Sequence, residues 1–191
     1  MKLRESGMPE ETYWESLFNI ELILDSFSIN SSIKNVAELG CGYGTFTIPV
    51  AKRTSGTIET IDIDSEMVKR IIERAQKAGI KNINASIRDV LVEGFPGEAE
   101  SKDACLLFNI LHGEDPIKVF REATRIVRLG SSIFVIHWRY DIQTPRGPDM
   151  KIRPRPEQIV EWAKETMCLN LKGSIIDLPP WHYGLWFKRI K

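Results

Sequence analysis

Cysteine is scarce in this sequence, and no two cysteines are spaced as a metal-binding or redox motif. Cys41, Cys105 and Cys168 are odd in number and lie far apart. This use of cysteine excludes a disulfide framework and a zinc site of ordinary spacing. We therefore expect no bound metal and a reducing, cytoplasmic location.

Long apolar runs and an excess of either charge are absent as well. No stretch approaches the ~20 apolar residues of a transmembrane helix, and residues 1–6 lack the apolar core of a signal peptide. Lys plus Arg and Asp plus Glu both number 26, so no overall field recruits nucleic acid or anionic lipid. We expect neither a membrane nor a nucleic acid as partner, and the sequence leaves the oligomeric state open.

A glycine-rich turn stands out among what the sequence does contain. The apolar run 35–39 has the character of a strand, and it is followed by Gly40, Gly42 and Gly44 and then by apolar residues at helical spacing. Glycine permits positive φ and close approach of a ligand to the backbone. The first amides of the following helix are unpaired at the positive end of its dipole. The turn therefore suits a small ligand with an anionic group.

The spacing of these glycines separates two classes of ligand. A dinucleotide fingerprint starting at Gly40 requires a third glycine at position 45, where this chain has Thr45. The segment Glu38-Leu39-Gly40-Cys41-Gly42-Tyr43-Gly44 instead resembles the E/D-x-G-x-G-x-G signature of class I S-adenosylmethionine-dependent methyltransferases. A glycine loop is a weak signal by itself, and a plain strand-to-helix turn is the alternative.

Later segments follow the same family pattern in order and spacing. Strand-like runs at 57–63, 83–87 and 103–108 alternate with helical patterns. The segments Phe108 to His112, Asp115-Pro116 and Arg125 to Gly130 look very like the fourth-strand to fifth-strand region of small-molecule methyltransferases. Ser131 stands where the family usually has a second glycine. The resemblance is strong over residues 33–140 and rests on topology elsewhere.

The resemblance implies an α/β fold and a cofactor. We expect a single Rossmann-like domain over residues 1–191, with a doubly wound seven-stranded sheet that is mostly parallel, an antiparallel last strand, and helices on both faces. Its parts are an N-terminal helical lid (1–30), a cofactor-binding core (33–140), a Pro/Arg-rich substrate-side insertion (141–156), and a final helix with a strand hairpin (157–191).

S-adenosyl-L-methionine is the implied cofactor, held at the carboxyl ends of the strands. Asp62 is expected to accept the ribose hydroxyls and Asp89 to lie near the adenine; the alternatives are helix capping for Asp62 and a turn or an ion pair with Arg88 for Asp89. Asp64 is the simpler helix cap. The expected cofactor-binding residues are Glu38, Gly40, Cys41, Gly42, Asp62, Ile63, Asp89, Val90 and Asn109.

The residues on the substrate side are less well defined by sequence. Tyr13 and Trp14 are lid candidates in a helix that begins near Pro9, and packing into the core is the alternative. His182 is the candidate general base, in a turn stiffened by two prolines, with His112 as its rival. The alternative to a general base is that His182 only forms hydrogen bonds with the backbone of the hairpin. Arg139 and Tyr183 complete the substrate-side candidates.

We therefore expect an S-adenosylmethionine-dependent methyltransferase that acts on a small organic substrate. The Asn-Pro-Pro-Tyr motif of enzymes that methylate nucleic-acid or glutamine amino groups is absent, because Asn109 is followed by Ile110. Two alternatives stay open: a protein that binds the cofactor without catalysis, and an NAD-linked oxidoreductase. The acceptor atom is not fixed by the sequence.

Overall fold

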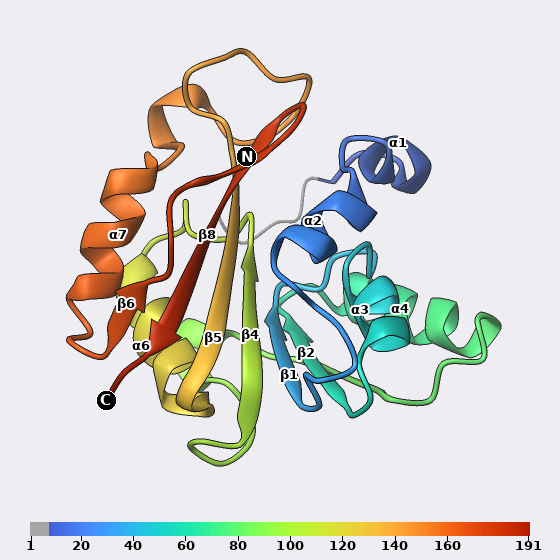
Figure 1. Cartoon of the computed structure of the whole chain (residues 1–191). Helices are drawn as coiled ribbons and strands as arrows, with labels where there is room; N and C mark the ends of the chain where they lie inside the picture. Colours follow the sequence, from blue (N-terminus) through green and yellow to red (C-terminus); the bar gives the residue numbers. More distant parts are fainter. Residues whose placement is uncertain (1–7) are drawn as a thin grey trace.

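The computed structural model describes residues 8–191, and within them eight strands form one sheet in the order β3-β2-β1-β4-β5-β8-β6, with β7 also paired to β8. Figure 1 shows this sheet with helices on both sides. The strands are β1 (Val36–Leu39), β2 (Ile58–Asp62), β3 (Ile83–Ile87), β4 (Lys102–Phe108), β5 (Val127–Trp138), β6 (Leu169–Leu171), β7 (Ile176–Leu178) and β8 (His182–Arg189). The helices are α1 (Glu11–Glu15), α2 (Ile20–Ser26), α3 (Thr47–Arg53), α4 (Ser65–Lys77), α5 (Val90–Glu93), α6 (Pro116–Ile126) and α7 (Pro156–Lys164), and a 3-10 turn spans Met150–Ile152.

The strand order confirms the predicted doubly wound sheet. β1 pairs in parallel with both β2 and β4, so the chain winds outward from β1 in two directions. β8 is antiparallel to β5 and lies beside it, as predicted for the last strand. The carboxyl ends of the five parallel strands therefore meet at one edge of the sheet.

The predicted number of seven strands is wrong by one. β6 pairs with the end of β8 and β7 with its beginning, both antiparallel, so the two lie one after the other along the same side of β8. Residues 172–175 interrupt what would otherwise be one edge strand, and Gly173 adopts a φ of 77° there. Positive φ is incompatible with continued extended pairing, which is why the edge divides into two strands.

Apolar residues cover both faces of the sheet. On one face α6 and α7 pack against the strands through residues such as Phe120, Ile126 and Ile159. On the other face α2 and α3 contribute Leu24, Phe27, Val50 and their neighbours. Figure 1 shows α6 and α7 on the side of β5 and β8 away from α2 and α3. No helix within residues 8–191 is long and apolar enough to cross a bilayer.

The N-terminal region contains two short helices where the sequence predicted one. Asn19 accepts a hydrogen bond from the Leu22 amide and so begins a second helix, α2. The first helix, α1, is fastened to α4 through Arg74, whose guanidinium contacts Glu11 at 3.1 Å and Glu15 at 2.7 Å. Residues 1–7 of the predicted lid lie outside the described residues.

Local hydrogen bonding sets the boundaries of α5 and α6. Asp89, for which a turn was the alternative expectation, accepts from the Leu91 amide and caps the short helix α5. The helix α6 ends at Ile126, and Gly130 lies inside β5 with a φ of 78°. The register of β4 against β5 shifts at this irregular place.

Residues 139–155 are held against the sheet by a buried arginine. The Arg153 guanidinium donates to the carbonyls of Arg139 (2.8 Å), Pro148 (2.9 Å) and Arg146 (3.3 Å). The Tyr183 hydroxyl donates to the Pro154 carbonyl at 2.6 Å. The Pro/Arg-rich insertion (141–156) is therefore held in place by these hydrogen bonds, and we call its segment of residues 144–148 the strap.

Candidate active site

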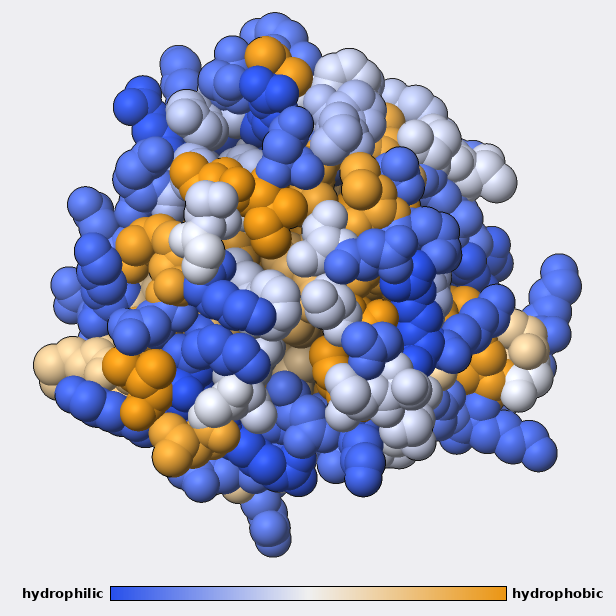
Figure 2. Space-filling view, in the orientation of Figure 1, coloured by the Kyte–Doolittle hydropathy of each residue, from blue (hydrophilic) through white to orange (hydrophobic). Residues whose placement is uncertain are grey.

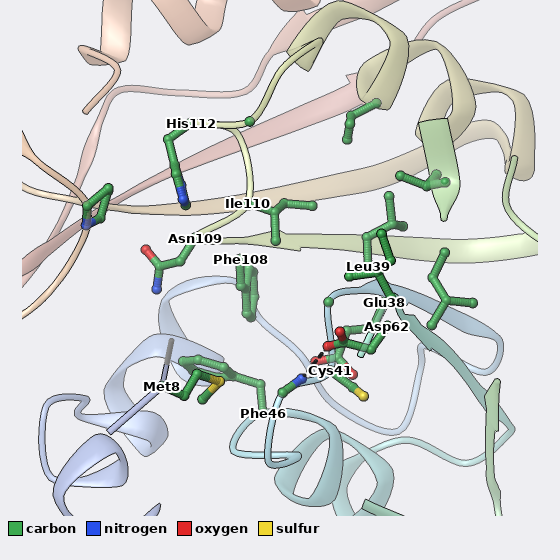
Figure 3. A pocket seen from close by; sticks show the side chains of 18 of the residues that line it. Met8, Glu38, Leu39, Cys41, Phe46, Asp62, Phe108, Asn109, Ile110 and His112 are labelled. Atoms are coloured by element: carbon green, nitrogen blue, oxygen red, sulfur yellow. Dashed lines mark hydrogen bonds between the residues drawn. The ribbon is translucent and has the colours of Figure 1, made fainter. Parts of the chain in front are cut away.

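A cavity of about 630 Å³ lies at the carboxyl ends of the parallel strands. Its lining comes from the glycine turn after β1, the ends of β2 and β4, the start of α5, the β4–α6 loop, Trp14 and the strap. Figure 3 shows Glu38, Cys41 and Asp62 on one side and Asn109 and His112 on the other, with Phe108 between them and Phe46 beside Met8. Figure 2 shows apolar residues gathered in the upper middle of a mostly hydrophilic face.

The glycine turn has the conformation that its sequence predicted. Gly40, Gly42 and Gly44 have φ values of 78°, 49° and 79°, a region that side chains strain. A Cβ on Gly44 would lie 2.0 Å from Ile71, and one on Gly40 would lie 2.9 Å from Ile110. The three glycines therefore allow the turn to fold closely against α4 and the β4–α6 loop.

The amides of this turn are largely engaged within the protein, which the sequence did not predict. Gly40 N–H donates to the Ile61 carbonyl at 2.7 Å, and Gly44 N–H donates to the Cys41 carbonyl at 2.8 Å. Gly42 N–H donates to Asp62 at 2.9 Å. The helix α3 begins only at Thr47, so its first amides lie beyond the glycines. An anionic group therefore finds no unengaged amide at the three glycines themselves, and its donors come from other residues of the cavity.

Thr45 is one such donor, and the sequence analysis did not select it as a binding residue. Its side chain lines the cavity and is buried, and its hydroxyl has no partner among the described residues. A buried hydroxyl without a hydrogen bond is costly unless a ligand or water satisfies it. This orphaned hydroxyl, together with the glycine turn, fits a polar ligand such as the cofactor.

Asp62 lies where β2 ends and serves the protein as well as the cavity. Its carboxylate accepts from the amides of Gly42 (2.9 Å) and Asp64 (3.0 Å). Burial raises the pKa of Asp62 above its ordinary value, against the opposing effect of these amides. A carboxylate has about four lone-pair sites, so the Asp62 oxygens retain capacity for hydroxyl donors in the cavity. Asp64, as predicted, caps α4 by accepting from the Glu66 amide.

Glu38 lies beneath the turn at the end of β1. Its buried carboxyl accepts from the hydroxyls of Thr47 (2.5 Å) and Thr60 (2.9 Å). Burial raises the pKa of Glu38 to about 7, although the two threonine hydrogen bonds act in the opposite direction. The group is thus part-protonated near neutral pH and ties the turn to α3 and β2.

All of the residues predicted to bind the cofactor line this cavity. Asn109 adopts a φ of 59° directly after β4, and its buried side-chain oxygen has no partner among the described residues. Such strain in a residue other than glycine gathers at functional sites. The set that the fold brings together is Glu38, Gly40, Cys41, Gly42, Asp62, Ile63, Asp89, Val90 and Asn109.

Four aromatic side chains form a second feature of the cavity, which we call the aromatic wall: Trp14, Phe46, Phe108 and Trp138. Phe46 and Phe108 meet edge to face with centroids 4.9 Å apart, and Trp14 and Trp138 do so at 6.0 Å. Phe18 packs behind them and contacts Phe46, Trp14 and Trp138. The wall is contiguous although its members come from four separate segments.

The sequence analysis predicted only Trp14 from this wall. Trp138 ends β5, so the rule that ligands meet the carboxyl ends of parallel strands could have selected it. The strap lies against the same indole, because a Cβ on Gly147 would lie 2.9 Å from the Trp138 ring. Arg146, Gly147 and Pro148 line the cavity there.

His112 lies on the β4–α6 loop and lines the cavity. Burial lowers the pKa of His112 to about 4, so its imidazole is neutral at neutral pH. Its Nδ1 is buried without a partner among the described residues. The ring of His137 stands edge to face behind it, with centroids 5.4 Å apart. In Figure 3 the His112 ring points from its loop toward Asn109.

The structure places four of the predicted substrate-side residues away from the cavity lining, contrary to the sequence prediction. His182 is the first residue of β8 and is buried between Phe18 (ring centroids 4.5 Å) and Trp138 (4.2 Å). The antiparallel pairing of His182 with Trp138 fixes it there. Tyr183 is buried on Pro154. Arg139 pairs with Asp141 at the surface, and Tyr13 is exposed.

Comparison with known proteins agrees with this geometry. Residues 36–130 match the family model described as a methyltransferase domain. Norajmaline N-methyltransferase of Rauvolfia serpentina is 23% identical over 150 residues, which cover 78% of this chain and 50% of that protein. The chain thus spans about half the length of the curated relatives that it matches.

Solved structures share the fold over nearly the whole chain. A S-adenosylmethionine-dependent methyltransferase from Aquifex aeolicus superposes with a TM-score of 0.80 at 21% identity, over 95% of this chain and 94% of its own. The [4+2]-cyclase SpnF superposes with a TM-score of 0.75 at 14% identity, over 97% and 84%. The family model shows that residues 36–130 belong to the methyltransferase domain family, and the solved structures show that the chain has the fold of S-adenosylmethionine-dependent methyltransferases.

Proposed function

We propose that this protein transfers the methyl group of S-adenosylmethionine to a small organic acceptor. The proposal rests on a single cavity whose two halves differ in their lining residues. One half holds the glycine turn and Asp62, and the other holds the aromatic wall and the neutral imidazole of His112. A cofactor half beside an acceptor half is the arrangement that group transfer between two bound molecules requires.

The cofactor half contains a suitable group for each part of the ligand. The remaining lone pairs of the Asp62 carboxylate suit the ribose hydroxyls, and the Thr45 hydroxyl suits the carboxylate of the methionine part. Asp89 and Val90, at the start of α5, suit the adenine, with Ile63 beside them. Glu38 braces the turn through Thr47 and Thr60.

The bound cofactor supplies a methyl group that is already activated for displacement, so the chain has to align the acceptor and exclude water. Orientation of two reactants can lower a barrier by on the order of 7–11 kcal/mol. The aromatic wall and the strap provide apolar surfaces that fix the acceptor. His112, neutral at pH 7 and with an unpartnered Nδ1 among the described residues, accepts a hydrogen bond from the acceptor and so helps to orient it.

Replacing Asp62 by alanine is expected to weaken S-adenosylhomocysteine binding by roughly tenfold or more, because hydrogen bonds to a charged group are worth about 1.5–3 kcal/mol each. Isothermal titration calorimetry measures the change. Asp64→Ala is the matched control, since Asp64 caps α4 and is not among the described residues that line the cavity. Equal affinities in the two variants would contradict the role of Asp62.

The proposed function is tested with the unmodified protein. S-adenosylhomocysteine is expected to raise the melting temperature and NAD to leave it unchanged, because a ligand stabilises the state to which it binds. Transfer of a labelled methyl group is then followed over a panel of small amines, alcohols, thiols and carbon nucleophiles. Stabilisation by NAD alone would instead support an oxidoreductase.

A second candidate function is cofactor binding without methyl transfer. The observation in its favour is that a structural neighbour of this fold is a [4+2]-cyclase. The fate of the labelled methyl group distinguishes the two candidate functions. A protein that binds S-adenosylhomocysteine but leaves the methyl group on the cofactor with every acceptor class would support this second candidate.

A further inference from the structure

The charge on the cavity lining is strongly unbalanced. Five carboxylates and two guanidiniums occur among the described residues of the lining, and none of those residues is a lysine. Burial keeps the pKa of His112 near 4, so it adds no charge at neutral pH. One of the carboxyls, Glu38, is part-protonated because its pKa is about 7. The lining therefore carries a net negative charge in a chain that is neutral overall. Glu38, Asp62 and Asp89 belong to the cofactor half, and in the acceptor half the carboxylates of Glu114 and Asp115, on the loop that follows His112, outnumber the guanidinium of Arg146. The carboxylates are Glu38, Asp62, Asp89, Glu114 and Asp115, and the guanidiniums are those of Arg88 and Arg146.

The negative lining favours some acceptors over others, according to the charge that each acceptor acquires during methyl transfer. A hydroxyl or carboxyl acceptor attacks as, or on the way to, an oxyanion, and an anion in a negatively lined cavity is disfavoured by like-charge repulsion. An amine attacks through a neutral lone pair and becomes a cation, which the same lining stabilises. The charge thus favours nitrogen over oxygen as the methyl acceptor.

The aromatic wall supports the same choice independently. The faces of tryptophan and phenylalanine attract organic cations through their quadrupoles, and tryptophan does so best. Trp14 is the partly exposed ring of this wall, whereas Phe46 (7% exposed), Phe108 (6%) and Trp138 (1%) border the cavity but are almost covered. Phe18 packs against Trp14, Phe46 and Trp138. The indole of Trp138 is further held by the strap. A cation with apolar substituents matches a surface that is aromatic and bordered by carboxylates.

We infer that the acceptor is an amine on an apolar body, which the cavity binds through the aromatic wall and its negative lining; this inference rests on the proposed function. The nitrogen lone pair forms a bond to the methyl carbon as the bond from that carbon to sulfur breaks. The positive charge passes from sulfur to nitrogen, so the net charge in the cavity does not change. An amine that enters in its protonated form gives that proton to water before it attacks. The ammonium product needs no base within the site and gives its proton, where it has one, to water on release.

Three benzyl compounds of different charge test the inference by direct binding: benzyltrimethylammonium, benzyl alcohol and benzoate. Each is titrated into the whole protein with and without S-adenosylhomocysteine, and tryptophan fluorescence and calorimetry report binding. The cation is expected to bind at least about tenfold more tightly than the alcohol, and benzoate most weakly. Equal binding of cation and alcohol, or tighter binding of benzoate, would overturn the inference.

Single substitutions test whether the cation binds at the aromatic wall. Trp14→Leu is expected to weaken benzyltrimethylammonium about fivefold and benzyl alcohol by less, because only the cation loses its interaction with the ring face. Trp162→Leu is the matched control, since Trp162 packs on the α6–α7 side of the sheet. Trp138→Leu serves as a second variant. If neither wall variant changes the preference for the cation, the inference is wrong.

The proposed function and this inference fail in different ways. Failure of the proposed function would appear as absence of S-adenosylhomocysteine binding, or as absence of methyl transfer to every acceptor class, whatever the three benzyl compounds do. Loss of the inference alone would appear as normal S-adenosylhomocysteine binding without preference for the cation.

Discussion

The free energy of unfolding is expected to fall by about 2 to 3 kcal/mol for each unit of acidification between pH 6.5 and pH 4.5. All three histidines of the chain are the cause. Burial lowers the pKa of His112 to about 4 and that of His182 to about 3, and it lowers the pKa of His137 well below the ordinary 6.5. Below pH 6.5 the histidines of the unfolded state therefore take up protons, whereas the buried histidines of the folded state stay neutral.

Each of these histidines contributes about 1.4 kcal/mol per pH unit in that window. Glu38 acts in the opposite direction, because burial raises its pKa from 4.5 to about 7. As the pH falls from 7 to 4.5 the folded state takes up this proton and the unfolded state does not, which offsets one histidine. About two protons remain as the net uptake on unfolding, and stability is lost as the pH falls.

Urea denaturation at pH 7, 6 and 5 measures this slope. His182→Phe is the informative variant, because its ring replaces an imidazole that already stacks on Phe18 and whose Nε2 has no partner among the described residues. The slope is expected to fall by about one proton in this variant. Unchanged stability between pH 7 and pH 5 in the unmodified protein would show that the buried histidines do not control its response to acid.

Replacing Arg153 by methionine is expected to lower the free energy of unfolding by about 2 to 4 kcal/mol. The buried guanidinium donates to three carbonyls of residues 139–148, and methionine fills a similar length without any donor. Carbonyls that lose their donor must be left unpaired or hydrated by opening of the strap. Arg146, Gly147 and Pro148 line the cavity, so opening also disturbs the acceptor half.

Two binding measurements separate this local effect from a general loss of structure. In Arg153→Met, benzyltrimethylammonium is expected to bind about threefold or more weakly, while S-adenosylhomocysteine stays within about twofold. Arg139→Met is the matched control, because the Arg139–Asp141 pair lies at the surface and such pairs are worth about 1 kcal/mol or less. Equal stability of the two variants would show that Arg153 does not hold the strap.

The cofactor half of the site could be predicted from the sequence because its determinants are local. The glycine spacing from Gly40 to Gly44 requires only that the turn fold tightly, and all three glycines have positive φ. Asp62, Asp89 and Asn109 each stand where a strand pattern stops. Since the ends of parallel strands meet at one edge, residues at those places converge however the rest of the chain packs.

The substrate side was predicted poorly because its determinants are pairings between distant segments. His182 was expected in a turn that faces the cavity, yet its pairing with Trp138 makes it the start of β8 and buries it against Phe18. Arg153 looked like one more arginine of a basic insertion, and only the fold shows that its partners are backbone carbonyls.

The glycine spacing and the strand ends, through the family resemblance that they carry, predicted the doubly wound fold and the residues that line the cofactor end of the cavity, because these signals act over a few residues. Only the tertiary structure decided which aromatic rings face the acceptor. The aromatic wall takes Trp14 from α1, Phe46 from the turn before α3, Phe108 from β4 and Trp138 from β5. No local pattern links four such segments; they meet because the sheet places the ends of β4 and β5 side by side and the N-terminal helices pack across them.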